Sequence, residues 1–298
     1  MKQFLALVVV LAIAGCALYV AQRRNHPDQV SANAVVDVAA DWQHDISRVP
    51  MRVTRISDEQ EVRIGNELAQ RYETPASSQT PESRAIERYI NQVGSKVAAH
   101  AKRQLPYRFH LVSDANLINA FALPGGHVFV GRGLLDLMTS EDELAFVLGH
   151  EIEHIDHHHA AERVQVEAQW HKLDLDVIGE ITQIPVSIWQ AGYSKDEEFE
   201  ADREGLRIGS AAGYSPQGAI DVLQKLGKLR DEYVIHAADP TEELSQLAIE
   251  GLNGYFRSHP LPSERIAQAK AVIAEDHLPA SRSLKPFRVD YEITAADH

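Results

Sequence analysis

Two histidines and a glutamate stand at a spacing that suits a metal ion. Residues 150–154 read His-Glu-Ile-Glu-His. In an α-helix, His150 and His154 lie about 40° apart on adjacent turns, with Glu151 inside the same arc of roughly 100°. Two imidazoles one turn apart can reach a single Zn²⁺ at about 2.0–2.1 Å. Glu151 would then face a water molecule that zinc acidifies, and would take its proton.

The segment around this motif has the pattern of a helix with one buried side. Ser140 is a candidate N-cap, and Glu143 three residues later would complete a capping box. Apolar residues at positions 144, 147, 148, 152 and 155 supply the buried side. The alternative, a solvated His-rich helix, would be polar all round. For His157 and His158 we favour that alternative, as solvated or weakly metal-scavenging side chains.

A third metal ligand must come from another part of the chain. The metzincin pattern requires Gly and His where this chain has His157 and Ala160, so that subclass is excluded. Glu198 and Asp202 are four residues apart and share one face of a helix. Glu198 would bind the zinc, while Asp202 would accept a hydrogen bond from a ligating histidine and fix its tautomer. An ordinary acidic helix face is the alternative reading of this pair.

The composition is that of a globular, acidic protein. The 298 residues include 29 Lys and Arg against 43 Asp and Glu, a formal net charge of −14. This balance argues against nucleic acid as a partner, because phosphate binding requires clustered basic residues. The single cysteine, Cys16, leaves histidines and carboxylates as the metal ligands. The 15 histidines leave a rival function open, a metal buffer that binds several ions weakly.

The N-terminus predicts a membrane tether. An apolar run starts at Phe4 and ends in Ile-Ala-Gly before Cys16, which resembles the lipobox of a bacterial lipoprotein. A single-pass helix over residues 4–21 is the alternative. We therefore divide the chain into a signal or anchor (1–16), a tether (17–52), a catalytic domain (53–278) and a C-terminal tail that we expect to be a surface arm (279–298).

The rest of the chain predicts a mainly helical α+β fold. We expect helices over 56–72 and 84–103 and a strand over 107–112. Residues 119–130 read as a loop, a turn at Gly125-Gly126, and a strand from His127 to Val130. After Ser140 the pattern is mostly helical.

Several motifs occur together in a fixed order. These are Asn119-Ala-Phe-Ala-Leu-Pro-Gly-Gly126, Val128-Phe-Val130, Gly133-Leu-Leu135, the His-Glu-x-x-His helix, Glu198-x-x-Ala-Asp-Arg203, and Ser258-His-Pro260 before Glu264-Arg-Ile266. The set resembles the gluzincin family of HtpX, the CAAX prenyl proteases, the mitochondrial Oma-type peptidases and the BepA-like periplasmic peptidases. Unlike HtpX and the prenyl proteases this chain lacks polytopic helices, and unlike BepA-like members it lacks a C-terminal repeat array.

The resemblance implies roles for particular residues. It implies one zinc ion per chain at His150, His154 and Glu198, with Glu151 as the base. His159 matches a recurring family histidine, which places it behind the ligands. His259 matches a position at the active site, where it would stabilise the oxyanion or block the fourth zinc position. The alternative is that His259 only belongs to a helix-entry turn, since Pro260 restricts it to extended geometry.

The resemblance also implies a fold and a function. We expect a zincin-type domain with a small sheet over the active-site helix, in a membrane-tethered endopeptidase that hydrolyses proteins in the bacterial periplasm or cell envelope. Strand 127–130 would be the sheet edge that binds an extended peptide, unless it is an inner strand. We therefore expect substrate contacts from Asn119, His127, Val128 and Phe129. A non-catalytic zinc-bearing assembly factor or holdase is the alternative function, and the oligomeric state stays open.

Overall fold

The computed structural model describes residues 56–73, 79–171, 173–181, 184, 192–236, 259, 262–279 and 284–287. The predicted anchor and tether lie outside these residues. Within the described part of the chain, no helix is long and apolar enough to cross a membrane. The first helices are α3 (Asp58–Ala69) and α4 (Pro81–Ala98). A capping box at the start of α3 forms between Ser57 and Gln60.

A three-stranded mixed sheet follows these helices. It consists of β1 (Arg108–Val112), β2 (Ala120–Leu123) and β3 (His127–Gly131), with the short 3-10 turn η2 (Pro124–Gly126) between the last two. The order is β1-β3-β2, with β3 parallel to β1 and antiparallel to β2. Gly125 and Gly126 both adopt positive φ angles, as the predicted turn requires.

Two expectations about this sheet were wrong. Residues 120–123 form a strand, although they were read as a loop, and strand 127–130 lies in the centre of the sheet rather than at its edge. Both errors have the same cause. The Ala-Phe-Ala-Leu run of residues 120–123 pairs with the side of β3 that does not face β1. A short apolar run does not reveal how many partners a strand has.

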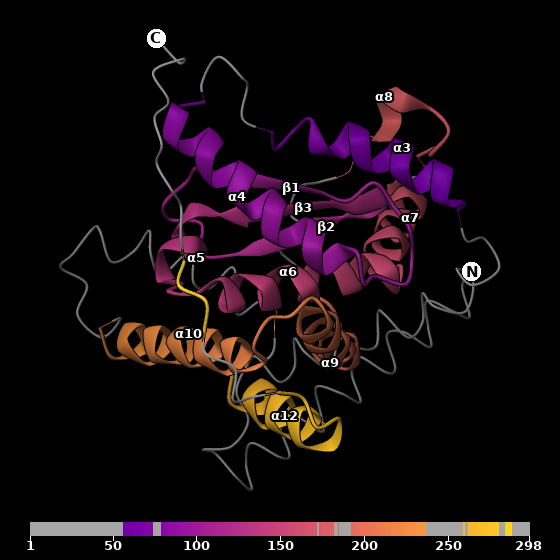
Figure 1. Ribbon diagram of the computed structural model, residues 1–298. Coiled ribbons are helices and arrows are strands. Elements are labelled where there is room, and N and C mark those ends of the chain that lie inside the picture. Colours follow the sequence, from indigo (N-terminus) through magenta and orange to yellow (C-terminus); the bar gives the residue numbers. More distant parts are fainter. Residues whose placement is uncertain are drawn as a thin grey trace, which may run out of the picture. The chain divides into compact units, whose positions relative to one another are not determined.

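The remaining elements are helices. They are α5 (Arg132–Leu137), α6 (Glu141–Asp156), α7 (His159–His171), α8 (Ile178–Ile181), α9 (Lys195–Ala211), α10 (Gln217–His236) and α12 (Pro262–Glu275). Figure 1 shows α6 running between the sheet and α9, with α12 on the far side of α9. The predicted α+β, mainly helical architecture is therefore confirmed.

The two faces of the sheet contribute to two hydrophobic clusters. Alternate side chains such as Phe109 and Val128 face the large core that α4, α6, α9, α10 and α12 share. The intervening side chains, including Leu123 and Phe129, pack with apolar residues of α3 and α7 in a smaller cluster. Because nearly all residues of α6 are buried, the polar residues near its C-terminal end are held in fixed positions by the packing around them.

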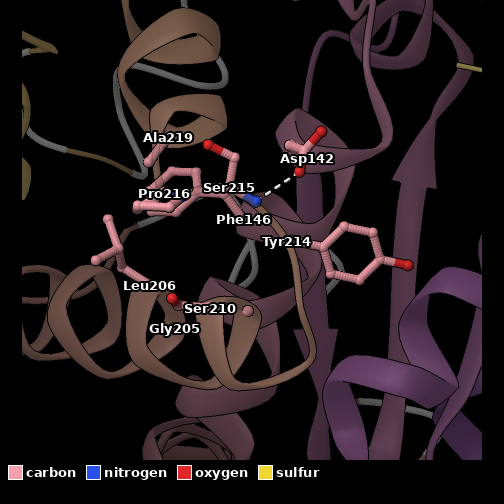
Figure 2. A pocket seen from close by; sticks show the side chains of 10 residues that line it. Asp142, Phe146, Gly205, Leu206, Ser210, Tyr214, Ser215, Pro216 and Ala219 are labelled. Carbon is pink, nitrogen blue, oxygen red and sulfur yellow. Dashed lines mark hydrogen bonds between the residues drawn. The ribbon is translucent and has the colours of Figure 1, made fainter. Parts of the chain in front are cut away.

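The first turn of α6 anchors several later segments. Asp142 accepts the backbone N–H of Ser215 at 2.6 Å and that of Lys285 at 2.6 Å. Figure 2 shows the first of these bonds beside the small pocket between α6, α9 and the start of α10. Residue Phe287 donates its N–H to Thr139. The four described tail residues, 284–287, are therefore bonded to the start of α6 while remaining partly or fully exposed, and the rest of the predicted surface arm lies outside the described residues.

Gly149 on α6 and Gly205 on α9 let the two helices approach closely. This contact can be tested. A Cβ atom at Gly205 would lie 2.6 Å from the His150 backbone nitrogen. We expect Gly205→Ala to lower the free energy of unfolding by about 1–3 kcal/mol, because the helices must separate. The matched control is Gly209→Ala on the same helix, whose Cβ would meet only Ala145 O, at 3.7 Å. That variant should be neutral or gain roughly 0.5–1 kcal/mol from helix propensity. Equal urea midpoints for both variants would refute the close contact.

Candidate metal centre

Helix α6 places its two histidines side by side. Ser140 caps the helix by accepting the Glu143 N–H, although Glu143 bonds to the Thr139 N–H and not to the cap residue. The imidazoles of His150 and His154 are buried, with their Nε2 atoms 3.1 Å apart. Both nitrogens can therefore bind one ion.

Helix α9 brings a carboxylate to the same point. A capping box of Ser194 and Glu197 starts the helix and sets Glu198 in its first turn. The two carboxylate oxygens of Glu198 lie 3.5 Å from His150 Nε2 and 3.5 Å from His154 Nε2. Donor atoms around a tetrahedral zinc ion with bonds of about 2.0–2.1 Å stand roughly 3.3 Å apart. The three residues therefore have the spacing of a zinc site.

The protonation states also suit a cation. Burial lowers the pKa of His150 to about 4 and lowers that of His154, so both rings are neutral with lone pairs. Burial alone would raise the pKa of Glu198, but the neighbouring His259, His154 and His150 hold it well below its usual value. Glu198 Oε1 is buried and has no hydrogen-bond partner among the described residues. Two neutral imidazoles and an ionised carboxylate with an unsatisfied oxygen fit Zn²⁺.

Asp202 and Arg265 support the His150 ring. His150 Nδ1 lies 2.9 Å from Asp202 Oδ1, so the carboxylate sets the tautomer that leaves Nε2 free. Arg265 reaches Asp202 with Nε at 2.7 Å and Nη2 at 2.6 Å. Burial would raise the pKa of Asp202, but Arg265 outweighs it and lowers the pKa to about 2. The sequence contained Arg265 in the last motif, but no role for it was predicted.

The other ligand histidine has partners of its own. His154 Nδ1 lies 3.0 Å from Nδ1 of His159, the residue expected behind the ligands. The Tyr193 ring stacks on His154 with centroids 3.8 Å apart, and the Arg163 guanidinium covers Tyr193 at 3.9 Å. Sequence reasoning missed Tyr193, since a lone tyrosine before a helix cap has no distinguishing pattern. Together these contacts fix the orientation of the His154 ring.

Glu151 lies beside the three candidate ligands without being one of them. Its carboxylate accepts a hydrogen bond from the backbone N–H of Ala122 on β2. Burial, and then the charge of Glu198, raise the pKa of Glu151 to about 8. A bound cation would oppose this shift. Glu151 is thus a poorly solvated carboxylate with affinity for a proton, as a general base requires.

His259 also reaches the centre. It is buried, and its Nδ1 lies 2.6 Å from Glu198 Oε2. Its ring centroid is 5.1 Å from that of His150, and one nitrogen of each ring lies within 4.8 Å of a Glu151 oxygen. The structure therefore places His259 among the candidate catalytic groups.

Three of the four predicted substrate residues lie on the central strand β3. Val128 and Phe129 are fully buried in the central strand. The His127 ring lies 3.0 Å from His110 Nε2 and 2.9 Å from Asn66 Oδ1, and Asn119 is also buried and bonds to the Ala120 N–H. His127, Val128 and Phe129 lie on the central strand, so their placement at a sheet edge was wrong, whereas Asn119 directly precedes the edge strand β2 and its contact with substrate stays a prediction. The backbone of β3 has a partner strand on each side, and its side chains are buried in the hydrophobic clusters on the two faces of the sheet.

The solvated interpretation of His157 and His158 was also wrong. Both side chains are partly buried at the turn between α6 and α7, where His158 has a φ of 63°. His157 lies 3.2 Å from Glu153, and His158 lies 3.4 Å from the buried Glu61. The contact of His157 with Glu153 is an i,i+4 pair, but Glu61 covers His158 from α3, a distant segment, which spacing within one helix cannot predict.

Comparison with known proteins identifies the family. Residues 84–273 match Peptidase family M48. This match covers well over half of the chain, so the chain belongs to that family, which confirms the resemblance predicted from the motifs. The chain is similar to the beta-barrel assembly-enhancing protease of Yersinia pestis, with 30% identity over 204 residues, which are 62% of this chain and 38% of that protein.

Two mitochondrial relatives are also similar to parts of the chain. The mitochondrial metalloendopeptidase OMA1 of Arabidopsis thaliana is 30% identical over 188 residues, 61% of this chain and 35% of the relative. The mitochondrial metalloendopeptidase OMA1 of Bos taurus is 35% identical over 129 residues, 37% of this chain and 24% of the relative. The chain thus spans less than half the length of these relatives.

Proposed function

We propose that this chain is a zinc-dependent endopeptidase of the gluzincin type, with one catalytic zinc ion per chain. The observation that supports this most is the buried set of His150, His154 and Glu198, with the unliganded carboxylate of Glu151 beside it. A non-catalytic holdase on the same fold would need the ligands but not this base. Casein hydrolysis that depends on zinc tests the proposal.

The residues of the site would have different roles in the reaction. His150, His154 and Glu198 would hold the zinc, which supplies a Lewis acid for the scissile carbonyl and for the attacking water. Glu151 takes a proton from that water as it attacks the carbonyl carbon, and returns a proton to the leaving amine nitrogen. The hydrogen bond from Ala122 holds Glu151 in place between these two transfers. Asp202 and His159 orient the two rings.

The substrate is a protein or peptide, and we infer that it lies along β2. Among the residues that the structure describes, this strand pairs only with β3, and its Ala122 N–H donates to Glu151. An extended peptide beside β2 would therefore bring its backbone to the base. This assignment replaces the one predicted for strand 127–130.

His259→Ala distinguishes the roles proposed for that residue. Loss of an oxyanion donor is expected to lower the rate of peptide hydrolysis by about 10²–10³. Loss of a group that blocks the fourth zinc position is expected to raise the rate instead. Because His259 contacts Glu198, zinc content must be measured in parallel as a control. A rate within twofold of wild type would exclude both roles and leave His259 as part of a turn.

We also propose that the enzyme is tethered in the bacterial cell envelope, facing the periplasm, and acts there on misfolded or unassembled proteins. The lipobox before Cys16 and the similarity to the beta-barrel assembly-enhancing protease support this. Cys16→Ser should abolish labelling with palmitate and leave an unprocessed precursor. A mature wild-type protein that keeps its N-terminus and takes up no palmitate would favour the single-pass anchor.

A further inference from the structure

Arg265 is a buried cation on α12 that contacts the metal centre from behind. Its Nε lies 2.7 Å from Asp202 Oδ2 and its Nη2 lies 2.6 Å from Asp202 Oδ1, so the guanidinium contacts both carboxylate oxygens. Both side chains are only 2% exposed. A two-point contact between a planar guanidinium and a carboxylate fixes the orientation of both groups. Asp202 is therefore held facing the His150 ring, which it contacts at Nδ1.

A second ion pair between the same parts of the chain lies at the surface and provides a comparison. Arg207 on α9 contacts Asp276, the residue after α12, with Nε 2.6 Å from Oδ2. These two side chains are 38% and 29% exposed. Water competes with an exposed ion pair, so such a pair contributes little to the position of a helix. The buried pair of Arg265 and Asp202 excludes water, and breaking it would leave a buried charge without a partner.

The segment that carries Arg265 also carries His259. His259 stands three residues before Pro262, the first residue of α12, and its Nδ1 lies 2.6 Å from Glu198 Oε2. Glu198 and Asp202 are four residues apart, on successive turns of α9. Two residues that are six apart in the chain, His259 and Arg265, thus contact successive turns of one helix. The contact of Arg265 fixes the position of α12 along α9, and with it the point from which His259 reaches Glu198.

We propose that Arg265 is a positioning residue for the reaction at the metal centre. Through Asp202 it holds the His150 ring in the orientation that binds the ion, and through α12 it holds His259 beside Glu198. Arg265 approaches His150 only at Nδ1, 3.4 Å away, on the side opposite the metal-binding nitrogen, so it is not itself a catalytic residue. The inference rests on the proposed function, because it assigns a further residue to the same site.

Lysine separates this role from a general need for a buried positive charge. A lysine ammonium is a point charge on a flexible chain and cannot reproduce the planar two-point contact of arginine. Arg265→Lys therefore keeps a cation opposite Asp202 but lets the carboxylate and α12 shift. Arg265→Gln removes the charge as well. If Arg265→Gln does not fold, Arg265→Lys still tests the proposal.

The test compares these variants with Arg207→Lys and Arg207→Gln, which change the exposed ion pair between the same parts of the chain. Each substitution is made in the full wild-type chain, and Arg265→Lys is also made in a His259→Ala background. Zinc affinity is measured by competition with a chromophoric chelator, which requires no activity. The kcat and KM for casein are measured at saturating zinc, and the urea midpoint reports folding.

We expect Arg265→Gln to lower zinc affinity by about 10–100-fold and Arg265→Lys to lower it less, while both Arg207 variants keep the wild-type affinity. At saturating zinc, Arg265→Lys should change kcat by about tenfold in the same direction as His259→Ala, with KM changed less than about twofold. In the His259→Ala background, the same substitution should change kcat by less than about twofold, because the group that it positions is absent.

Wild-type zinc affinity in both Arg265 variants, or equal effects of Arg265→Lys on kcat in the two backgrounds, would overturn the positioning role. A lower urea midpoint with unchanged zinc affinity and kcat would also overturn it, since Arg265 would then serve stability alone. Zinc affinities in the expected order with no hydrolysis by any protein would instead refute the proposed peptidase function, and would support the action of Arg265 on the metal ligands.

Discussion

Glu151→Gln is expected to leave about one tightly bound zinc ion per chain and to lower hydrolysis by several orders of magnitude. Glutamine matches the shape of glutamate and can keep the contact with β2, but it cannot accept a proton from water. The Glu151 carboxylate is buried, so solvent is poorly placed to take over as the base. Zinc content and the rate of casein hydrolysis should be measured on the same sample.

The control for this variant is Glu141→Gln, in the first turn of the same helix. It removes one carboxylate from α6 at a distance from the metal centre, so zinc content and rate should both stay near wild type. Hydrolysis by Glu151→Gln at even a tenth of the wild-type rate would exclude Glu151 as the base.

Glu198→Ala should lower the affinity for the tight zinc ion sharply, because it removes the only carboxylate within reach of both imidazole Nε2 atoms in the described structure. Glu200→Ala is the matched control, two residues along the same helix. Glu200 points away from this centre and lies beside His157, so the tight ion should remain. Affinity is best measured by competition with a chromophoric chelator.

Asp202→Ala should cause an intermediate loss of about 10–100-fold, since Asp202 acts through the His150 ring. The geometry therefore predicts the largest loss of zinc affinity for Glu198→Ala, a smaller loss for Asp202→Ala and the smallest for Glu200→Ala. Equal losses in the Glu198 and Glu200 variants would show that the third ligand has been assigned to the wrong residue.

The parts of the site that sequence could predict are those fixed by helical spacing. His150, Glu151 and His154 share one face of a helix whatever the tertiary fold, and Ser140 marks where that helix begins. Glu198 was predictable only as a candidate, because its approach to α6 depends on packing between helices distant in sequence. The structure brings it to the two histidines through the contact at Gly149 and Gly205.

The parts that could not be predicted depend on long-range pairing. Arg265 supports Asp202 from a helix 63 residues away, and no local pattern indicates that contact. The central position of β3 depends on the pairing of β2, which four apolar residues do not specify. The rings of His157 and His158 are covered by carboxylates from other segments, so a polar run in sequence is partly buried in the fold.

The most direct test of the central claim is the rate of casein hydrolysis by the wild-type chain as zinc is removed with a chelator and then returned in measured amounts. We predict that activity falls to background in the metal-free protein and returns in proportion to zinc, reaching its maximum at about one ion per chain. Hydrolysis that persists in the metal-free protein, or that never appears at any zinc loading, would contradict a zinc peptidase built on His150, His154 and Glu198.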